Sequence, residues 1–248
     1  MPAPYPMPPP GPITCGAPCA AIVAADVARA LAEDLGTGDA SAALVDADSR
    51  GEALVIAREP MVLAGTAWFD ACLRALDPEC AIDWSFSDGD TVTANTQLCA
   101  ISARARALLS AERSALNFLQ TLSGTATTTA AYVARTLGSP TRLLDTRKTL
   151  PGLRYAQKYA VKVGGGENHR LGLYDAVLIK ENHILAAGGI GPAIARSRAL
   201  WPALLIEIEV ESLAEYFEAL AARPDRIMLD ELSMDDMKSA VAARPPGI

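Results

Sequence analysis

The chain contains 248 residues, of which 50% are hydrophobic and 21% are charged, and its mean hydropathy is +0.18. This composition excludes intrinsic disorder for most of the chain, and the length allows one large domain or two modest ones. The net charge of −7 argues against general nucleic-acid binding, and no segment approaches the roughly 18–20 consecutive apolar residues that a membrane span needs.

The basic residues are concentrated in one part of this acidic chain. The window 147–180 contains seven lysines and arginines and only two acidic residues, so it carries +5 while the remainder carries −12. A local positive patch on an acidic protein suggests a small anionic ligand, although a solvated helix face would have the same composition.

The cysteines indicate a reducing compartment. They form no Cys-x-x-Cys pair, and their odd number and scattered positions argue against a disulfide framework or a zinc site. We therefore expect the protein in the cytoplasm, with most of these thiols buried as small hydrophobic groups. The five are Cys15, Cys19, Cys72, Cys80 and Cys99.

The first half of the chain predicts an α+β domain at 19–120, behind a disordered proline-rich tail at 1–18. Apolar residues spaced at helical intervals predict helices at 20–35, 65–76 and 105–122, the last of them closed by Ser123 and Gly124. Short β-like runs predict strands at 53–57, 61–64, 82–86 and 97–101.

The second half, 121–248, alternates between short apolar runs and helical patterns, which predicts parallel strands with crossover helices. The predicted strands are 142–144, 176–179, 204–210 and 226–229. The predicted helices are 152–163, 192–200, 213–222 and 234–242.

Charged residues end each of these parallel strands. Asp145 follows the first, Lys180 the second, Glu207 and Glu209 lie on one face of the third, and Asp230 ends the fourth. Because the carboxyl ends of strands in an α/β barrel meet at one mouth, this pattern indicates an active site. Buried carboxylates need compensating cations, either lysines and arginines or a hard metal ion such as Mg²⁺; an internal salt-bridge network is the alternative.

Three consecutive glycines, Gly164–Gly166, lead into Glu167, Asn168, His169 and Arg170. They allow positive φ angles or a close approach of the backbone to a ligand, although the spacing is neither that of a dinucleotide-binding loop nor that of a P-loop. Several arginines near one another suit a ligand with more than one carboxylate or phosphate. For His183, a structural role is the simpler interpretation.

Several long motifs, in this order along the chain, resemble the quinolinate phosphoribosyltransferase family, which is also called nicotinate-nucleotide pyrophosphorylase. The resemblance extends from about residue 20 to the end of the sequence. The motifs are 33–39 (EDLGTGD), 111–120 (AERSALNFLQ), 145–154 (DTRKTLPGLR), 158–161 (KYAV), 164–170 (GGGENHR) and 173–183 (LYDAVLIKENH).

The resemblance implies a mixed α/β fold with an N-terminal α/β sandwich domain and a C-terminal, incomplete α/β barrel similar to a TIM barrel. It implies a homodimer with a shared active site. The implied reaction joins quinolinate to 5-phosphoribosyl 1-diphosphate, giving nicotinate mononucleotide, pyrophosphate and CO2 in de novo NAD synthesis, with Mg²⁺ as cofactor.

The same resemblance implies a role for each matching residue. Arg147, His169 and Arg170 would bind the two carboxylates of quinolinate, beside Thr146, and Arg113 would be contributed across the dimer. Lys148 and Lys180 would contact the phosphoribosyl diphosphate, and Glu209 and Asp230 would hold Mg²⁺ and the ribose. These two lysines and two carboxylates are the expected catalytic residues.

Two departures from the family pattern stand out. Glu231, where the family usually has asparagine, adds a negative charge after Asp230. The sequence also ends at Ile248, before the family's Ser-Gly segment and phosphate-binding glycine loop, so we expect a C-terminally truncated barrel.

Three other functions are compatible with the sequence. One is a substrate-shifted relative of the same fold, of the type associated with molybdenum transport. Another is an aldolase that forms a Schiff base through Lys180, which needs a neutral amine. The third is a protein that binds a dicarboxylate without catalysis.

Overall fold

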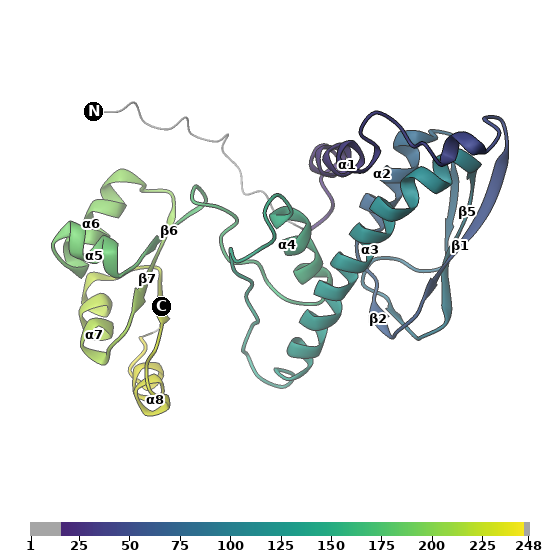
Figure 1. Ribbon diagram of the computed structural model, residues 1–248. Coiled ribbons are helices and arrows are strands. Elements are labelled where there is room, and N and C mark those ends of the chain that lie inside the picture. Colours follow the sequence, from purple (N-terminus) through teal and green to yellow (C-terminus); the bar gives the residue numbers. More distant parts are fainter. Residues whose placement is uncertain (1–15, 246–248) are drawn as a thin grey trace. The chain divides into compact units, whose positions relative to one another are not determined.

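The computed structural model describes residues 16–245 (Figure 1). It divides into two compact units, and their described parts are 16–169 and 170–245. The proline-rich segment 1–15, most of the predicted tail, lies outside the described residues. Within 16–245, no helix has both the length and the apolar content needed to cross a membrane.

The first unit contains a three-stranded antiparallel sheet in the order β1-β5-β3 and a separate two-stranded pair, β2-β4. Its strands are β1 (Arg50–Ala57), β2 (Met61–Val62), β3 (Ala81–Trp84), β4 (Thr91–Val92) and β5 (Thr96–Arg104). Its helices are α1 (Ala20–Leu35), the 3₁₀ turn η1 (Ala42–Leu44), α2 (Thr66–Leu76), α3 (Ala105–Ala134) and α4 (Arg154–Val163).

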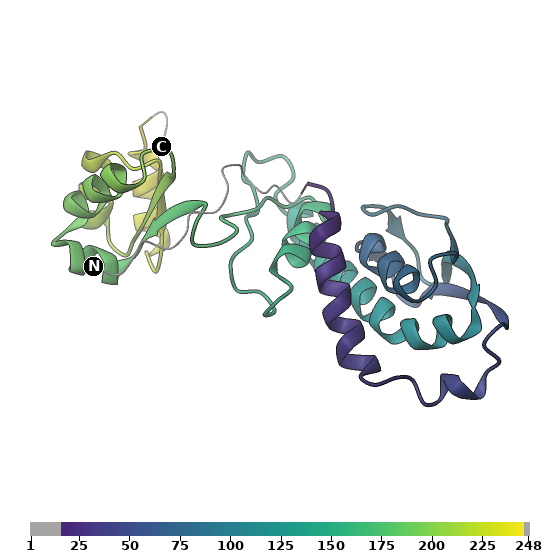
Figure 2. The same cartoon turned by 90° about the horizontal axis from the view of Figure 1, so that it is seen from above.

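The core of this unit forms where α2 packs on α3, with α1 beside both (Figure 2). Trp68 and Phe69 on α2 and Leu122 on α3 are almost fully buried. The ring of Phe69 meets Trp84 of β3 edge to face, with 5.3 Å between the centroids, so α2 also covers the sheet.

Helix α3 is twelve residues longer than the sequence predicts, because Ser123 and Gly124 do not end it. Ser123 donates its hydroxyl to Ala64 O at 3.1 Å, and Thr125 and Thr127 donate theirs to carbonyls one turn earlier. A hydroxyl that donates to the carbonyl one turn earlier is a known arrangement within a helix, so these residues do not have to end it. The predicted stop at 123–124 was therefore wrong.

Helix α4 belongs to the first compact unit, which extends beyond the predicted domain boundary at 120/121. The Tyr159 hydroxyl donates to Asp88 at 2.7 Å, and its ring lies 5.5 Å from that of Trp68. The Tyr155 hydroxyl donates to Ala17 O at 2.8 Å. These bonds attach the region after α3 to the N-terminal elements, which is why the compact units divide at 169/170.

The second unit is a parallel sheet in the order β6-β7-β8, with a helix after each strand (Figure 1). Its strands are β6 (Ala176–Ile179), β7 (Leu205–Val210) and β8 (Arg226–Leu229). Its helices are α5 (Glu181–Ala187), α6 (Ile190–Leu200), α7 (Leu213–Ala222) and α8 (Met234–Ala242). This alternation is the one the sequence predicts, except that α5 and, in the first unit, β4 were missed.

The side chains of β7 alternate between the two faces of this sheet. Ile206, Ile208 and Val210 are fully buried in a core that includes residues of α6 and α7. Glu207 and Glu209 alternate with them and are also buried. The sheet therefore has an apolar face covered by helices and carries carboxylates on its other face.

The predicted strand 142–144 is not formed as a strand. Leu144 makes a single parallel bridge to Glu167, and both residues belong to the first unit.

Candidate functional site

The two units share the candidate residues between them. Arg113, Thr146, Arg147, Lys148 and His169 lie in the first unit. Arg170, Lys180, Glu209 and Asp230 lie in the second.

In the first unit, the segment that starts at Asp145 runs beside the segment that follows the glycines. Glu167 N–H donates to Leu143 O at 2.8 Å, and Asp145 N–H donates to Glu167 O at 3.0 Å. These two backbone bonds place the residues after Asp145 next to His169.

Asp145 is the acceptor that joins the two segments. Its carboxylate accepts from His169 N–H at 2.8 Å and from Asn168 Nδ2 at 2.7 Å, and it is ion-paired with Lys158 of α4. The Asp145 side chain is 7% exposed, so these bonds form largely out of contact with water.

Arg147 has a buried donor that is not hydrogen-bonded within residues 16–245. Among the described residues, its buried Nε is the one buried side-chain nitrogen or oxygen without a hydrogen-bond partner. Thr146 and Lys148 on either side are exposed, and Lys148 N–H donates to Thr146 Oγ1 at 3.0 Å. A buried donor left unpaired is costly, which favours an anionic ligand that accepts from Arg147.

The glycines Gly164–Gly166 serve helix packing. A Cβ at Gly164 would meet Ala126 O of α3 at 2.4 Å, and one at Gly166 would meet Thr129 Cγ2 at 3.0 Å. Gly165 has a φ of +86°. The sequence analysis suggested that these glycines allow the backbone to approach a ligand closely. In the structure, the glycines at the end of α4 allow the backbone to approach α3 closely.

Gly164→Ala is expected to lower the free energy of unfolding by about 1–3 kcal/mol, because the methyl group would overlap the α3 backbone. The matched control is Gly124→Ala on exposed α3 surface, where no atom lies within 4 Å. That variant should be stabilised by about 0.5–1 kcal/mol. Urea denaturation followed by circular dichroism measures both, and equal values for the two would contradict the packing role.

Arg113 lies on α3 and borders a cavity of about 390 Å³ in the first unit. The cavity is also lined by Arg29, Glu33 and Asp34 of α1 and by Gly152. Arg113 is exposed, so its guanidinium is accessible at this surface.

In the second unit, Lys180 and Glu209 form a bidentate ion pair across β6 and β7. Lys180 Nζ donates to the two carboxylate oxygens of Glu209 at 2.8 and 2.7 Å. The side chain of Glu209 is 9% exposed and that of Lys180 is 42% exposed. Lys180 is thus the cation that pairs with the buried carboxylate of Glu209, and it keeps one side open to solvent.

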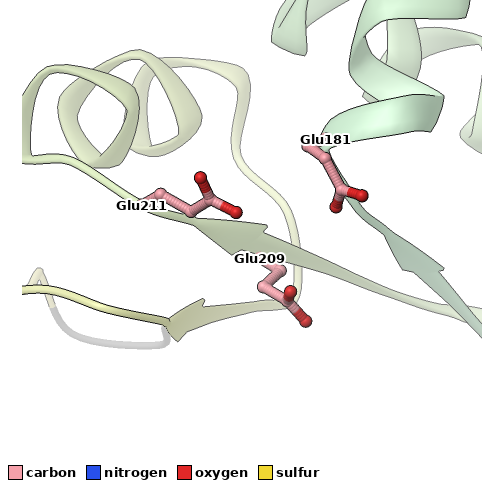
Figure 3. A group of neighbouring side chains, drawn as sticks. All are labelled: Glu181, Glu209 and Glu211. Atoms are coloured by element: carbon pink, nitrogen blue, oxygen red, sulfur yellow. The ribbon is translucent and has the colours of Figure 1, made fainter.

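A cluster of carboxylates surrounds this pair. Figure 3 shows Glu209 on β7, Glu211 just after the strand and Glu181 in the first turn of α5. One oxygen from each lies within 4.8 Å of the others. Desolvation, followed by repulsion from Glu181 and other carboxylates, raises the pKa of Glu211. Asp230 is one of those repelling groups but is not a member of the close triad.

Arg170 lines an apolar cavity of about 970 Å³ between β6 and α6, together with Tyr174 and His183. His183 has a structural bond as well, because its Nδ1 accepts from Lys180 N–H at 3.0 Å at the start of α5. This capping contact agrees with the structural role expected for His183.

Sequence reasoning missed two groups. Lys158 and Asn168 are part of the family motifs, but the sequence analysis assigned no role to either. The position of Lys158 on the apolar side of α4 was the signal that could have identified it. Glu181 and Glu211 were also missed, although Glu181 directly follows Lys180 and Glu211 lies two residues after Glu209.

Comparison with known proteins identifies relatives over nearly the whole chain. Residues 39–123 match the family model for the quinolinate phosphoribosyl transferase N-terminal domain, and 125–246 match the model for its C-terminal domain. The N-terminal family model ends at residue 123 and the C-terminal one begins at residue 125, so the two meet inside α3.

Among curated proteins, the probable nicotinate-nucleotide pyrophosphorylase [carboxylating] of Synechocystis is 42% identical over 233 residues, covering 94% of this chain and 79% of that protein. The nicotinate-nucleotide pyrophosphorylase [carboxylating] of Mycobacterium leprae is also 42% identical, covering 88% and 78%. The solved nicotinate-nucleotide pyrophosphorylase from Francisella tularensis has a TM-score of 0.89 at 44% identity, covering 94% of this chain and 82% of that one. The chain thus spans about four fifths of each relative.

Proposed function

Because this chain belongs to the quinolinate phosphoribosyltransferase family, we propose that it transfers the phosphoribosyl group of 5-phosphoribosyl 1-diphosphate to quinolinate. Decarboxylation accompanies the transfer and gives nicotinate mononucleotide, pyrophosphate and CO2, a step in NAD synthesis. The observation that carries this proposal is the nearly unbroken match to both family domains over 39–246.

In the first unit, we assign Arg147 and His169 to the carboxylates of quinolinate, beside Thr146. The unpartnered Nε of Arg147 supports this assignment, because a carboxylate would satisfy it. Exposed Lys148 is assigned to a phosphate oxygen of the second substrate. In the second unit, Arg170 is assigned to quinolinate as a further cation.

Lys180, Glu209 and Asp230 are assigned to the phosphoribosyl diphosphate. As pyrophosphate departs, positive charge develops on the ribose carbon, and carboxylates nearby stabilise it while Lys180 stabilises the leaving oxygens. Loss of the 2-carboxylate as CO2 then leaves a carbanion beside the cationic ring nitrogen, and this carbon takes up a proton from water to give nicotinate mononucleotide. Orientation and charge placement are sufficient for this sequence, so no covalent nucleophile is needed.

The chain has a donor set that fits Mg²⁺. Carboxylate oxygens are the ligands this hard cation prefers, and it usually binds through one or two carboxylates together with substrate phosphates. We propose that Glu209 and Asp230 hold it at the ribose and diphosphate. Glu181 and Glu211 lie close to Glu209 and add negative charge there. When bound, Mg²⁺ would neutralise charge on the departing diphosphate.

A Schiff-base aldolase is the less favoured alternative. Lys180 donates to both oxygens of Glu209, so its Nζ is engaged in an ion pair and is not free to attack a carbonyl.

We also propose a homodimer in which Arg113 acts in the neighbouring subunit, supported by its exposure on α3. A cytoplasmic location is supported by the free thiols of Cys72, Cys80 and Cys99. Burial raises the pKa of Cys72 to about 12, so this thiol is unreactive.

The test is a product assay with quinolinate, 5-phosphoribosyl 1-diphosphate and Mg²⁺, with nicotinate as a parallel substrate. We expect nicotinate mononucleotide and CO2 from quinolinate and no product from nicotinate. Product from nicotinate would contradict the decarboxylating reaction. Quinolinate binding by calorimetry without turnover would favour the non-catalytic dicarboxylate-binding protein, and neither binding nor turnover would favour a substrate-shifted relative.

A further inference from the structure

Lys158 is a buried charge outside the assigned catalytic groups. Its side chain, on α4, is 1% exposed and is ion-paired with Asp145, whose side chain is 7% exposed. Burying two charges costs desolvation that their attraction does not reliably repay, and an apolar pair of similar volume is often as stable. Stability alone is therefore a weak explanation for this pair.

The bonds of the pair converge on the residue that we assign to quinolinate. Lys158 Nζ donates to His169 O at 2.9 Å, and Asp145 accepts from His169 N–H at 2.8 Å. The backbone of His169 is thus fixed on both sides. Asn168 Nδ2 closes the network by donating to Asp145 at 2.7 Å and to Lys158 O at 2.9 Å.

The same pair fixes the start of the segment that carries Arg147. Asp145 lies two residues before Arg147, and its own N–H is bonded to Glu167 O at 3.0 Å. The network therefore ties together the Asp145–Lys148 segment, the Glu167–His169 segment and α4. Ion pairs and hydrogen bonds with defined directions restrict geometry more than apolar contacts do.

We propose that Lys158 and Asp145 are positioning residues that set the separation of Arg147 and His169 to match the two carboxylates of quinolinate. This inference rests on the proposed function of these two residues. It assigns to the pair a part in quinolinate affinity, although neither side chain is assigned a contact with substrate.

The test compares Lys158→Met with the double variant Asp145→Asn/Lys158→Met. The single variant leaves the buried Asp145 carboxylate without its counter-ion, so the melting temperature should fall and quinolinate binding should weaken. The double variant removes both charges and should recover most of the melting temperature. We expect its KM for quinolinate to remain at least about tenfold raised, with a smaller change in kcat, because Arg147 and His169 are displaced.

The matched control is Lys162→Met, one turn further along α4. Lys162 pairs with Glu167 at 3.3 Å, and their side chains are 35% and 45% exposed. Because this pair is partly exposed, the KM of Lys162→Met for quinolinate should equal that of the unchanged protein. Asn168→Ala keeps the ion pair and removes only the amide donations. It removes two hydrogen bonds and should raise the KM for quinolinate about threefold to tenfold.

A double variant that recovers both its melting temperature and its quinolinate KM would overturn the proposal and leave the pair a purely structural role. If neither Lys158 variant folds, Asp145→Asn takes their place, because it removes one charge of the pair at nearly constant size; a folded Asp145→Asn with an unchanged KM for quinolinate would overturn the proposal. Turnover by the unchanged protein separates the proposed function from the positioning role. If the unchanged protein has no turnover, the proposed function fails. If it has turnover and the variants keep its KM for quinolinate, only the positioning role fails.

Discussion

Arg147→Ala is expected to weaken quinolinate binding by about two orders of magnitude, because one carboxylate of the ligand loses its guanidinium partner. The fold should persist, since Arg147 is only partly buried and its Nε has no hydrogen-bond partner within the described chain. Isothermal titration calorimetry with quinolinate measures the affinity, and circular dichroism checks the fold.

Arg135→Ala is the matched control for this prediction. Arg135 directly follows α3 in the same unit, is exposed, and places its guanidinium 5.8 Å from the ring centre of Tyr132. Its removal should leave quinolinate affinity unchanged. Equal affinities for Arg147→Ala and Arg135→Ala would show that Arg147 does not bind the dicarboxylate.

Lys180→Met should lower kcat/KM for the complete reaction by about 10²–10³-fold, the loss typical of removing one donor to developing negative charge. The substitution also leaves Glu209, whose side chain is 9% exposed, without the ammonium that binds both of its oxygens. Steady-state kinetics with 5-phosphoribosyl 1-diphosphate as the varied substrate measures the loss.

Lys238→Met provides the comparison in the same unit. Lys238 pairs with Asp235 at 3.1 Å, and their side chains are 70% and 93% exposed. Because exposed ion pairs contribute little, kcat/KM of Lys238→Met should be close to that of the unchanged protein. If Lys180→Met retained full activity, its assignment to the diphosphate would be wrong. Trapping of Lys180 by borohydride in the presence of a carbonyl substrate would instead support the aldolase.

Local patterns in the sequence predict much of the fold. The helical spacing of apolar residues gives the bounds of α1, α7 and α8 as the structure has them. Ser212 and Ser233 cap α7 and α8 by accepting from backbone N–H groups. These features depend on residues within one or two turns of each other, so the chain path does not affect them.

The candidate residues could be found from the sequence for a related reason. A charged residue directly after a parallel strand lies at the carboxyl edge of the sheet, whatever the crossover helices do. Lys180 was selected in this way and Glu209 from the alternation of side chains along its strand, and the structure pairs the two residues. The family motifs added Arg147 and His169, which periodicity alone does not distinguish from other polar residues.

By itself, then, the sequence determined the strand–helix alternation, the strand-end charges and the family. Only the tertiary structure decided that α3 continues past Gly124, that the glycines Gly164–Gly166 serve its packing, and that Lys158 is buried against Asp145. These features join residues 13 to 59 positions apart. Such contacts depend on how the chain returns to itself, whereas local propensity extends over only a few residues.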